Sequence, residues 1–306
     1  MGSTLRQDWL VALGFGICAI KSRRLLLGGA LLAYAGLSRA FPSEAALFLA
    51  VPVLWFAFDF WREKQRLPRV SDLRSSQRPA LRALAGAAGC VLGVFLLSSA
   101  VFGVSNNWGA WHEKYDTLTE TPTSNHVGLR NLVAFSSDTS AGSLAQKQNT
   151  NVWSDWDRLQ RANFSARIPL YYLALLLATA LALLACRGRS LEQIVPIGLL
   201  LVPFYSYPAN IYCHFVFLLP LAMVVLGEQA ERNRNFAMAV VVLAGLAIAQ
   251  AFTLGEMWTD LRYTDQSTLL LIAVGFLLFR LARESWRRSP LWKKEDPAGE
   301  PDAPAA

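Results

Sequence analysis

The stretch that decides the fold is Ile168-Pro-Leu-Tyr-Tyr-Leu-Ala-Leu-Leu-Leu-Ala-Thr-Ala-Leu-Ala-Leu-Leu-Ala185, which has no charged residue and lies between Arg167 and Arg187. A helix that crosses the hydrocarbon core of a bilayer needs about 20 mostly apolar residues, with a range of about 17–25. This stretch meets that requirement, and similar uncharged runs recur along the chain between short basic segments. The sequence therefore predicts a membrane protein made of transmembrane helices.

The composition of the whole chain agrees with that prediction and excludes other classes. The chain has 306 residues, of which 54% are hydrophobic and 17% are charged. A soluble domain has about 25% charged residues. The excess of apolar residues excludes an intrinsically disordered chain. With four cysteines in this length, the chain is also no small disulfide-stapled domain.

The predicted fold class is all-α, a polytopic transmembrane helix bundle of about nine spans. The expected spans are Trp9–Ile20, Leu25–Phe41, Ala45–Phe60, Ala83–Val104, Ile168–Ala185, Ile194–Tyr207, Ile211–Leu226, Phe236–Leu254 and Thr268–Ala282. The spans that meet at Tyr205–Asn210 are either two helices in a tight hairpin or one long helix broken at Pro208, since proline removes a backbone donor.

The basic residues predict the orientation of this bundle. In the expected order of spans, 20 of the 29 Lys and Arg residues fall on one side of the membrane. Cytoplasmic loops carry the excess of Lys and Arg. We therefore expect an outer N-terminus and a cytoplasmic C-terminus. The net charge of +7 then reflects helix ends facing anionic lipids, and we expect membrane lipids as partners and no nucleic acid.

Four parts of the chain follow from this topology. Residues 1–104 hold about four spans and residues 168–282 about five. Residues 283–306 form a cytoplasmic tail that we expect to be disordered. Residues 105–167 form one outer-face segment of about 60 residues, with Trp108, Trp111, Trp153 and Trp156 at helical spacing. Tryptophan favours the headgroup level of a bilayer, so we expect interfacial aromatic helices there.

Five residues at the outer side are candidates for a binding site. Arg39, His126, Arg130, Tyr207 and His214 all lie at outer span ends or in the outer segment. Arginine can hold a phosphate through two hydrogen bonds, and Tyr and His add neutral donors. We therefore expect these residues to border one cavity that receives an anionic lipid headgroup. The alternative is that they are spread around the aromatic belt and do not meet.

No metal or cofactor is expected. The three histidines, His112, His126 and His214, have no metal-motif spacing, and the four cysteines have no CxxC pairing. Phosphate-binding, dinucleotide-binding and HExxH motifs are also missing from the sequence.

Leu26-Leu-Gly-Gly-Ala-Leu-Leu-Ala-Tyr-Ala-Gly-Leu-Ser-Arg-Ala-Phe-Pro42 resembles the AG-x-LLG-x-A-x-x-x-R-x-FP span of bacterial GT-C type membrane proteins, which include polyprenol-phosphate-mannose-dependent mannosyltransferases. The elements Ser124–Leu129 and Tyr205–His214 are similar to later parts of such chains. The resemblance covers roughly residues 25 to 226. It implies a glycosyltransferase, or part of one, that uses a polyprenyl-phosphate-linked sugar at the outer face of the cell inner membrane.

The sequence departs from this family in one respect. GT-C enzymes carry a catalytic carboxylate in the first outer loop, whereas the acids nearest to that position here are Asp8 and Glu44, neither of them in a substantial loop. The chain thus resembles the C-terminal portion of a longer GT-C protein, and no catalytic residue is assigned. The alternative is a non-catalytic multi-pass protein such as a scaffold, an assembly factor or a transporter subunit. A carboxylate that faces a cavity on the outer side of the membrane would favour the glycosyltransferase over the non-catalytic protein.

The expected orientation can be tested by cysteine labelling of intact cells. A cysteine at Ser143 should react with an impermeant maleimide, and a cysteine at Ser75 should not, because the membrane shields the cytoplasmic loops. Labelling at Ser75 without labelling at Ser143 would invert the topology.

Overall fold

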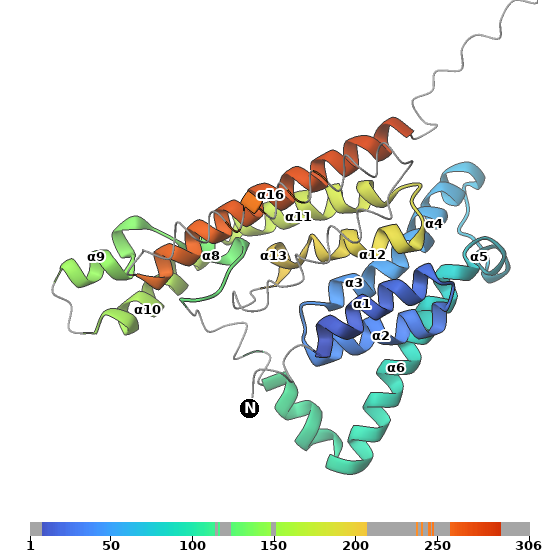
Figure 1. Cartoon of the computed structure of the whole chain (residues 1–306), viewed down its shortest axis with the longest axis horizontal. Coiled ribbons are helices and arrows are strands. Elements are labelled where there is room, and N and C mark those ends of the chain that lie inside the picture. The colour runs from blue at the N-terminus through green and yellow to red at the C-terminus, as the bar shows by residue number, and fades with distance from the viewer. Residues whose placement is uncertain are drawn as a thin grey trace, which may run out of the picture.

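The computed structural model describes residues 8–113, 116, 124–147, 151–206 and 258–288, with single positions between 237 and 247. Within these residues every regular element is a helix (Figure 1). The α-helices are α1 (Asp8–Lys21), α2 (Leu25–Ser38), α3 (Ser43–Leu47), α4 (Val51–Lys64), α5 (Val70–Ser76), α6 (Arg78–Phe102), α8 (Leu129–Ala134), α9 (Ala141–Gln146), α10 (Val152–Ala166), α11 (Ile168–Cys186), α12 (Leu191–Leu199), α13 (Val202–Tyr205) and α16 (Thr259–Arg288). The 3-10 helices η2 (Phe48–Ala50) and η4 (Ser137–Thr139) and the π-helix η3 (Ser105–Gly109) complete the set.

Four of the described helical stretches are long and apolar enough to cross a membrane. They are Ser43–Lys64, Arg78–Phe102, Ile168–Cys186 and Asp260–Trp286. Two further apolar stretches, Leu25–Ser38 and Leu191–Tyr205, are shorter. These helices confirm the prediction of an all-α, multi-pass membrane protein. The count of nine spans stays a prediction, because Ile211–Leu226 and most of Phe236–Leu254 lie outside the described residues.

The long helices share two ends, which we name after what they carry. The loop face is the end at Phe102, Ile168, Tyr205 and Thr259, where the segment 105–167 begins and ends. The basic face is the opposite end, at Lys64, Arg187 and Arg288. In Figure 1, α11 and α16 lie side by side along their lengths, with α12 and α13 following one another below them.

Helices α2 and α6 pack with their backbones in direct contact. A Cβ atom at Gly29 would overlap the carbonyl of Ala83, and a Cβ atom at Gly86 would overlap the carbonyl of Leu26. Glycine at both crossing points is therefore required for this approach, as in other closely packed transmembrane helices. Beyond the crossing, α6 diverges from α1 and α2 towards Phe102 (Figure 1).

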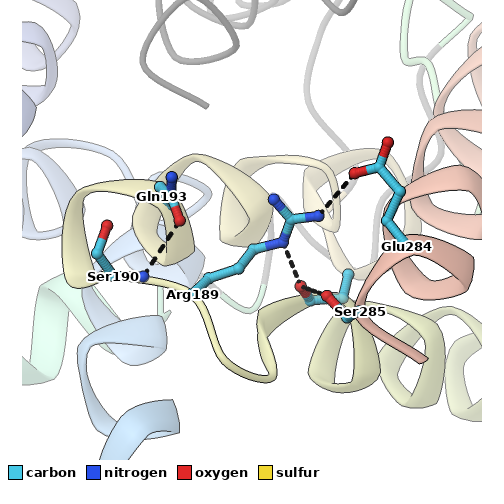
Figure 2. A network of polar contacts seen from close by, with 6 residues as sticks. Arg189, Ser190, Gln193, Glu284 and Ser285 are labelled. Atoms are coloured by element: carbon cyan, nitrogen blue, oxygen red, sulfur yellow. Dashed lines mark hydrogen bonds and ion pairs between the residues drawn. The ribbon is translucent and has the colours of Figure 1, made fainter. Parts of the chain in front are cut away.

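At the basic face, one buried ion pair joins three helices (Figure 2). The side chain of Arg189 is 4% exposed and lies 3.1 Å from Glu284 of α16. Its Nε also donates to the carbonyl oxygen of Ala185 at 2.7 Å, and Ser285 donates to the same oxygen at 2.8 Å. Next to it, the amide of Ser190 donates to Gln193 and caps α12. A paired, hydrogen-bonded charge tolerates burial, so these contacts hold together the end of α11, the start of α12 and the last turns of α16.

The glycine crossing gives a prediction with a matched control on the same helix. Gly86→Ala should lower the stability of the protein by about 1–3 kcal/mol, because the new methyl group overpacks the contact with α2. Gly89→Ala should be neutral or stabilising by up to about 1 kcal/mol, because a Cβ atom there meets nothing within 4 Å and alanine favours helix. Thermal unfolding of both variants in detergent measures the difference. Equal stabilities would contradict the close packing of α2 on α6.

Candidate functional site

A cavity of about 670 Å³ lies towards the loop face, between α2, α3, α6 and the end of α13. Its walls are mostly Ala, Gly, Leu and Val side chains of α2 and α6. Ala40, Ala46, Leu47 and Ala50 add further apolar lining, and the polar or aromatic lining residues are Ser43, Glu44, Trp111, Tyr205 and Ser206. Ligand sites of this size typically combine apolar walls with a few polar groups. We call this space the Glu44 cavity.

Glu44 supplies the only carboxylate among the lining residues of the Glu44 cavity. Its Oε1 accepts a hydrogen bond from the Ser206 hydroxyl at 2.7 Å. Its Oε2 is buried and has no hydrogen-bond partner in the part of the chain that the structure describes. One carboxylate oxygen is thus held in place, and the other can accept a hydrogen bond or a proton from a bound molecule.

Two local features of the sequence bring Glu44 and Ser206 together. Gly198 of α12 lets α3 pack closely, since a Cβ atom there would lie 2.8 Å from the backbone oxygen of Glu44 and 2.9 Å from the Phe48 ring. The chain then turns after α12, and Pro203 starts the short helix α13. Proline suits the first turn of a helix because no backbone donor is needed there. Helix α13 ends at Tyr205, so Ser206 faces Glu44.

Aromatic side chains line one side of the Glu44 cavity. Trp108 packs on Phe95 of α6, with ring centroids 5.3 Å apart, and on Trp111 at 6.1 Å. The residues after η3 therefore return along α6 and bring Trp111 to the cavity. The hydroxyl of Tyr205 lies 2.6 Å from Thr179 of α11. Flat aromatic faces of this kind suit the apolar face of a sugar ring or a lipid chain.

His126 and Arg130 lie near this site, His126 on the loop before α8 and Arg130 in the first turn of α8, which contacts α13. Gly128 between them has a φ of +130°, and a Cβ atom there would lie 2.6 Å from the Pro203 oxygen and 3.3 Å from the Ser206 oxygen. Its amide donates to Ser267 of α16 at 3.0 Å, which anchors the loop to the bundle. The loop between His126 and α8 is thus packed against Ser206, the residue that donates a hydrogen bond to Glu44.

Arg130 and His126 have different environments. The Arg130 guanidinium lies over the Phe164 ring, 4.7 Å from its centroid. Burial, and secondarily the charge of Arg130, lower the pKa of His126 to about 4. His126 is therefore neutral at pH 7 and offers both a donor and an acceptor nitrogen.

The structure describes three of the five predicted site residues. Arg39 ends α2, directly before Ala40 of the cavity wall. Arg39, His126 and Arg130 do not themselves line the Glu44 cavity. Tyr207 and His214 lie outside the described residues, so the convergence of all five on one cavity stays a prediction.

Sequence reasoning assigned no catalytic residue and passed over Glu44. The available signal was an acid at an outer span end, with Phe41-Pro42 before it and Ala45-Ala46 after it. Only the fold adds that Ser206, from a distant part of the chain, meets this acid beside a cavity. Among the described residues, no group of three or more His, Cys, Asp or Glu side chains is arranged to hold a metal ion.

Comparisons with known proteins assign no family and no function to the chain. No family model matches the chain, no curated protein matches it, and no solved structure matches it. The site must therefore be interpreted from its own chemistry.

The neutral state of His126 predicts a pH dependence of stability. The unfolded chain takes up this proton near the ordinary pKa of 6.5, whereas the folded protein resists it until about pH 4. Stability should therefore fall as the pH drops from 6.5 towards 4, and His126→Gln should flatten that fall. Thermal unfolding across this range measures it, with His112→Gln, an exposed histidine, as the control. An unchanged profile in His126→Gln would contradict the assignment.

Proposed function

We propose that this protein is a GT-C-like membrane glycosyltransferase, or part of one, and that Glu44 is its catalytic base. The observation that supports this proposal is a carboxylate with one anchored and one unbonded oxygen in a cavity at the loop face. Glu44 also comes two residues after Pro42, at the end of the span that resembles the GT-C family.

The reaction would be the transfer of a sugar from a polyprenyl phosphate to an acceptor hydroxyl. Glu44 Oε2 takes the proton of that hydroxyl, and the acceptor oxygen forms a bond to the anomeric carbon. The bond between this carbon and the phosphate oxygen breaks, and its electron pair leaves with the polyprenyl phosphate. General base catalysis of this kind contributes typically 10²–10⁴-fold to a rate.

The remaining groups fit the two substrates. Trp111 and Tyr205 would stack on a sugar ring, while the apolar walls from α2 and α6 would accept part of the lipid chain. Arg39 and Arg130, together with neutral His126, remain the candidates for the donor phosphate, with Tyr207 and His214 completing the set. This donor is lipid-bound, so no metal and no other cofactor is required.

The proposal includes a topology. The protein would lie in the cell inner membrane with about nine spans, its N-terminus outside and its C-terminus in the cytoplasm. The loop face, with the Glu44 cavity, would then be the outer face. Polyprenyl-phosphate sugars would reach the cavity from that leaflet.

The base is tested by an isosteric substitution. Purified protein in nanodiscs should release polyprenyl phosphate from polyprenyl-phosphate mannose when a membrane glycan extract supplies acceptors. Glu44→Gln should reduce that release by about 100-fold or more, because glutamine cannot take the proton. Binding of the donor, followed by native mass spectrometry, should persist in the variant.

Glu63→Gln is the matched control, because Glu63 is an exposed acid at the other end of the same helical stretch. It should keep full activity. Donor binding without any transfer, in wild type and variants alike, would favour the non-catalytic alternative. Full activity of Glu44→Gln would show that Glu44 is not the catalytic base. Absence of donor binding by the wild-type protein would contradict the proposal as a whole.

A further inference from the structure

A second, larger hollow lies at the opposite end of the molecule, where α5 meets α6. This groove has a volume of about 1050 Å³ and is lined by Arg74, Arg78 and Arg82, with Ser71 and Ser75 beside them. The three arginines recur every four residues across the junction of the two helices, and all three line the groove. We call this hollow the arginine groove.

No residue that the structure describes neutralises the charges of the arginine groove. Across residues 8–113, 124–147, 151–206 and 258–288, Arg74, Arg78 and Arg82 form no hydrogen bond or ion pair through their side chains, and all three are exposed. The nearest acid in the sequence, Asp72, already accepts from the Arg69 amide at 2.9 Å and pairs with Arg66 at 3.5 Å. The described residues thus leave three clustered positive charges open to a negative partner.

The apolar residues in and beside the arginine groove indicate that its negative partner comes from the membrane. Val70, Leu73 and Leu81 contribute to the groove itself. Val70 is 74% exposed, and so is Leu67, three residues before it. From Leu81 the apolar surface continues along α6 through the exposed Leu92 and Leu96, on a helix that is long enough to cross a membrane. A ligand here would meet positive charge at one end and a hydrocarbon-like surface at the other.

We propose that the arginine groove binds the phosphodiester headgroup of an anionic phospholipid, with an acyl chain lying along α6. Guanidinium groups hold phosphate oxygens through paired hydrogen bonds. This site lies at the basic face and does not depend on the function proposed for the Glu44 cavity.

The test compares lipid binding by the full chain and by two matched triple variants. Native mass spectrometry of the protein in detergent, titrated with phosphatidylglycerol or phosphatidylcholine, gives the two affinities. Wild type should prefer phosphatidylglycerol. Arg74→Gln/Arg78→Gln/Arg82→Gln should weaken phosphatidylglycerol binding by about 10- to 100-fold, given the usual contribution of each basic residue. Lys21→Gln/Arg24→Gln/Arg62→Gln, which removes three charges of the basic face outside the groove, should stay within about threefold of wild type.

Each remaining outcome would overturn the proposal. Equal losses in both triple variants would mean that general surface charge, not the groove, attracts the lipid. Unchanged binding in the groove variant would place the lipid elsewhere. Displacement of phosphatidylglycerol by millimolar inorganic phosphate would assign the groove to a soluble anion. Thermal unfolding without lipid checks that both variants are folded.

Discussion

The structure depends first on the direct backbone contact between α2 and α6. Gly29 and Gly86 allow the two helices to touch, and the contact is near their cytoplasmic-predicted, basic ends. Ala33 of α2, one turn after Gly29, and Leu84 and Ala87 of α6, on either side of Gly86, already line the Glu44 cavity. A contact this close at one end, followed by divergence, creates the space between them. Small residues in the walls keep that space open.

The two ends of the bundle use buried charge differently. At the basic face, Arg189 and Glu284 neutralise each other and share further hydrogen bonds, so the charges are structural. At the loop face, Glu44 has a single described partner, a neutral hydroxyl, and one oxygen without any. An incompletely bonded buried carboxylate costs stability. Such groups persist mainly where a ligand or a reaction uses them. The contrast with the Arg189–Glu284 pair therefore favours a functional role for Glu44.

The segment 105–167 is built into the loop face. Asp260 at the start of α16 accepts from the Ala141 amide at 2.8 Å, and Arg167 donates to the carbonyl oxygens of Val133 and Phe135. These bonds hold α8 and α9 against the ends of α11 and α16. The loop of His126 and the first turn of α8, which carries Arg130, are thereby fixed beside α13, so the proposed site has a rigid support.

The sequence by itself determined the class of the protein and the extent of α11, whereas the longest described helix, α16, extends well beyond its predicted span Thr268–Ala282. Ile168–Ala185 was predicted as a span and α11 runs over Ile168–Cys186, because an uncharged run of this length is stable only as a helix in lipid or in a buried core. Hydropathy is a local property, so it finds such segments without any knowledge of their neighbours. Hydropathy gave no means of choosing Glu44 over Asp8 as the candidate functional carboxylate. Only the tertiary structure shows that Glu44 meets Ser206 beside a cavity, because the Glu44–Ser206 hydrogen bond joins residues 162 positions apart. The cavity likewise arises from the packing of four separate elements, and no local pattern encodes that.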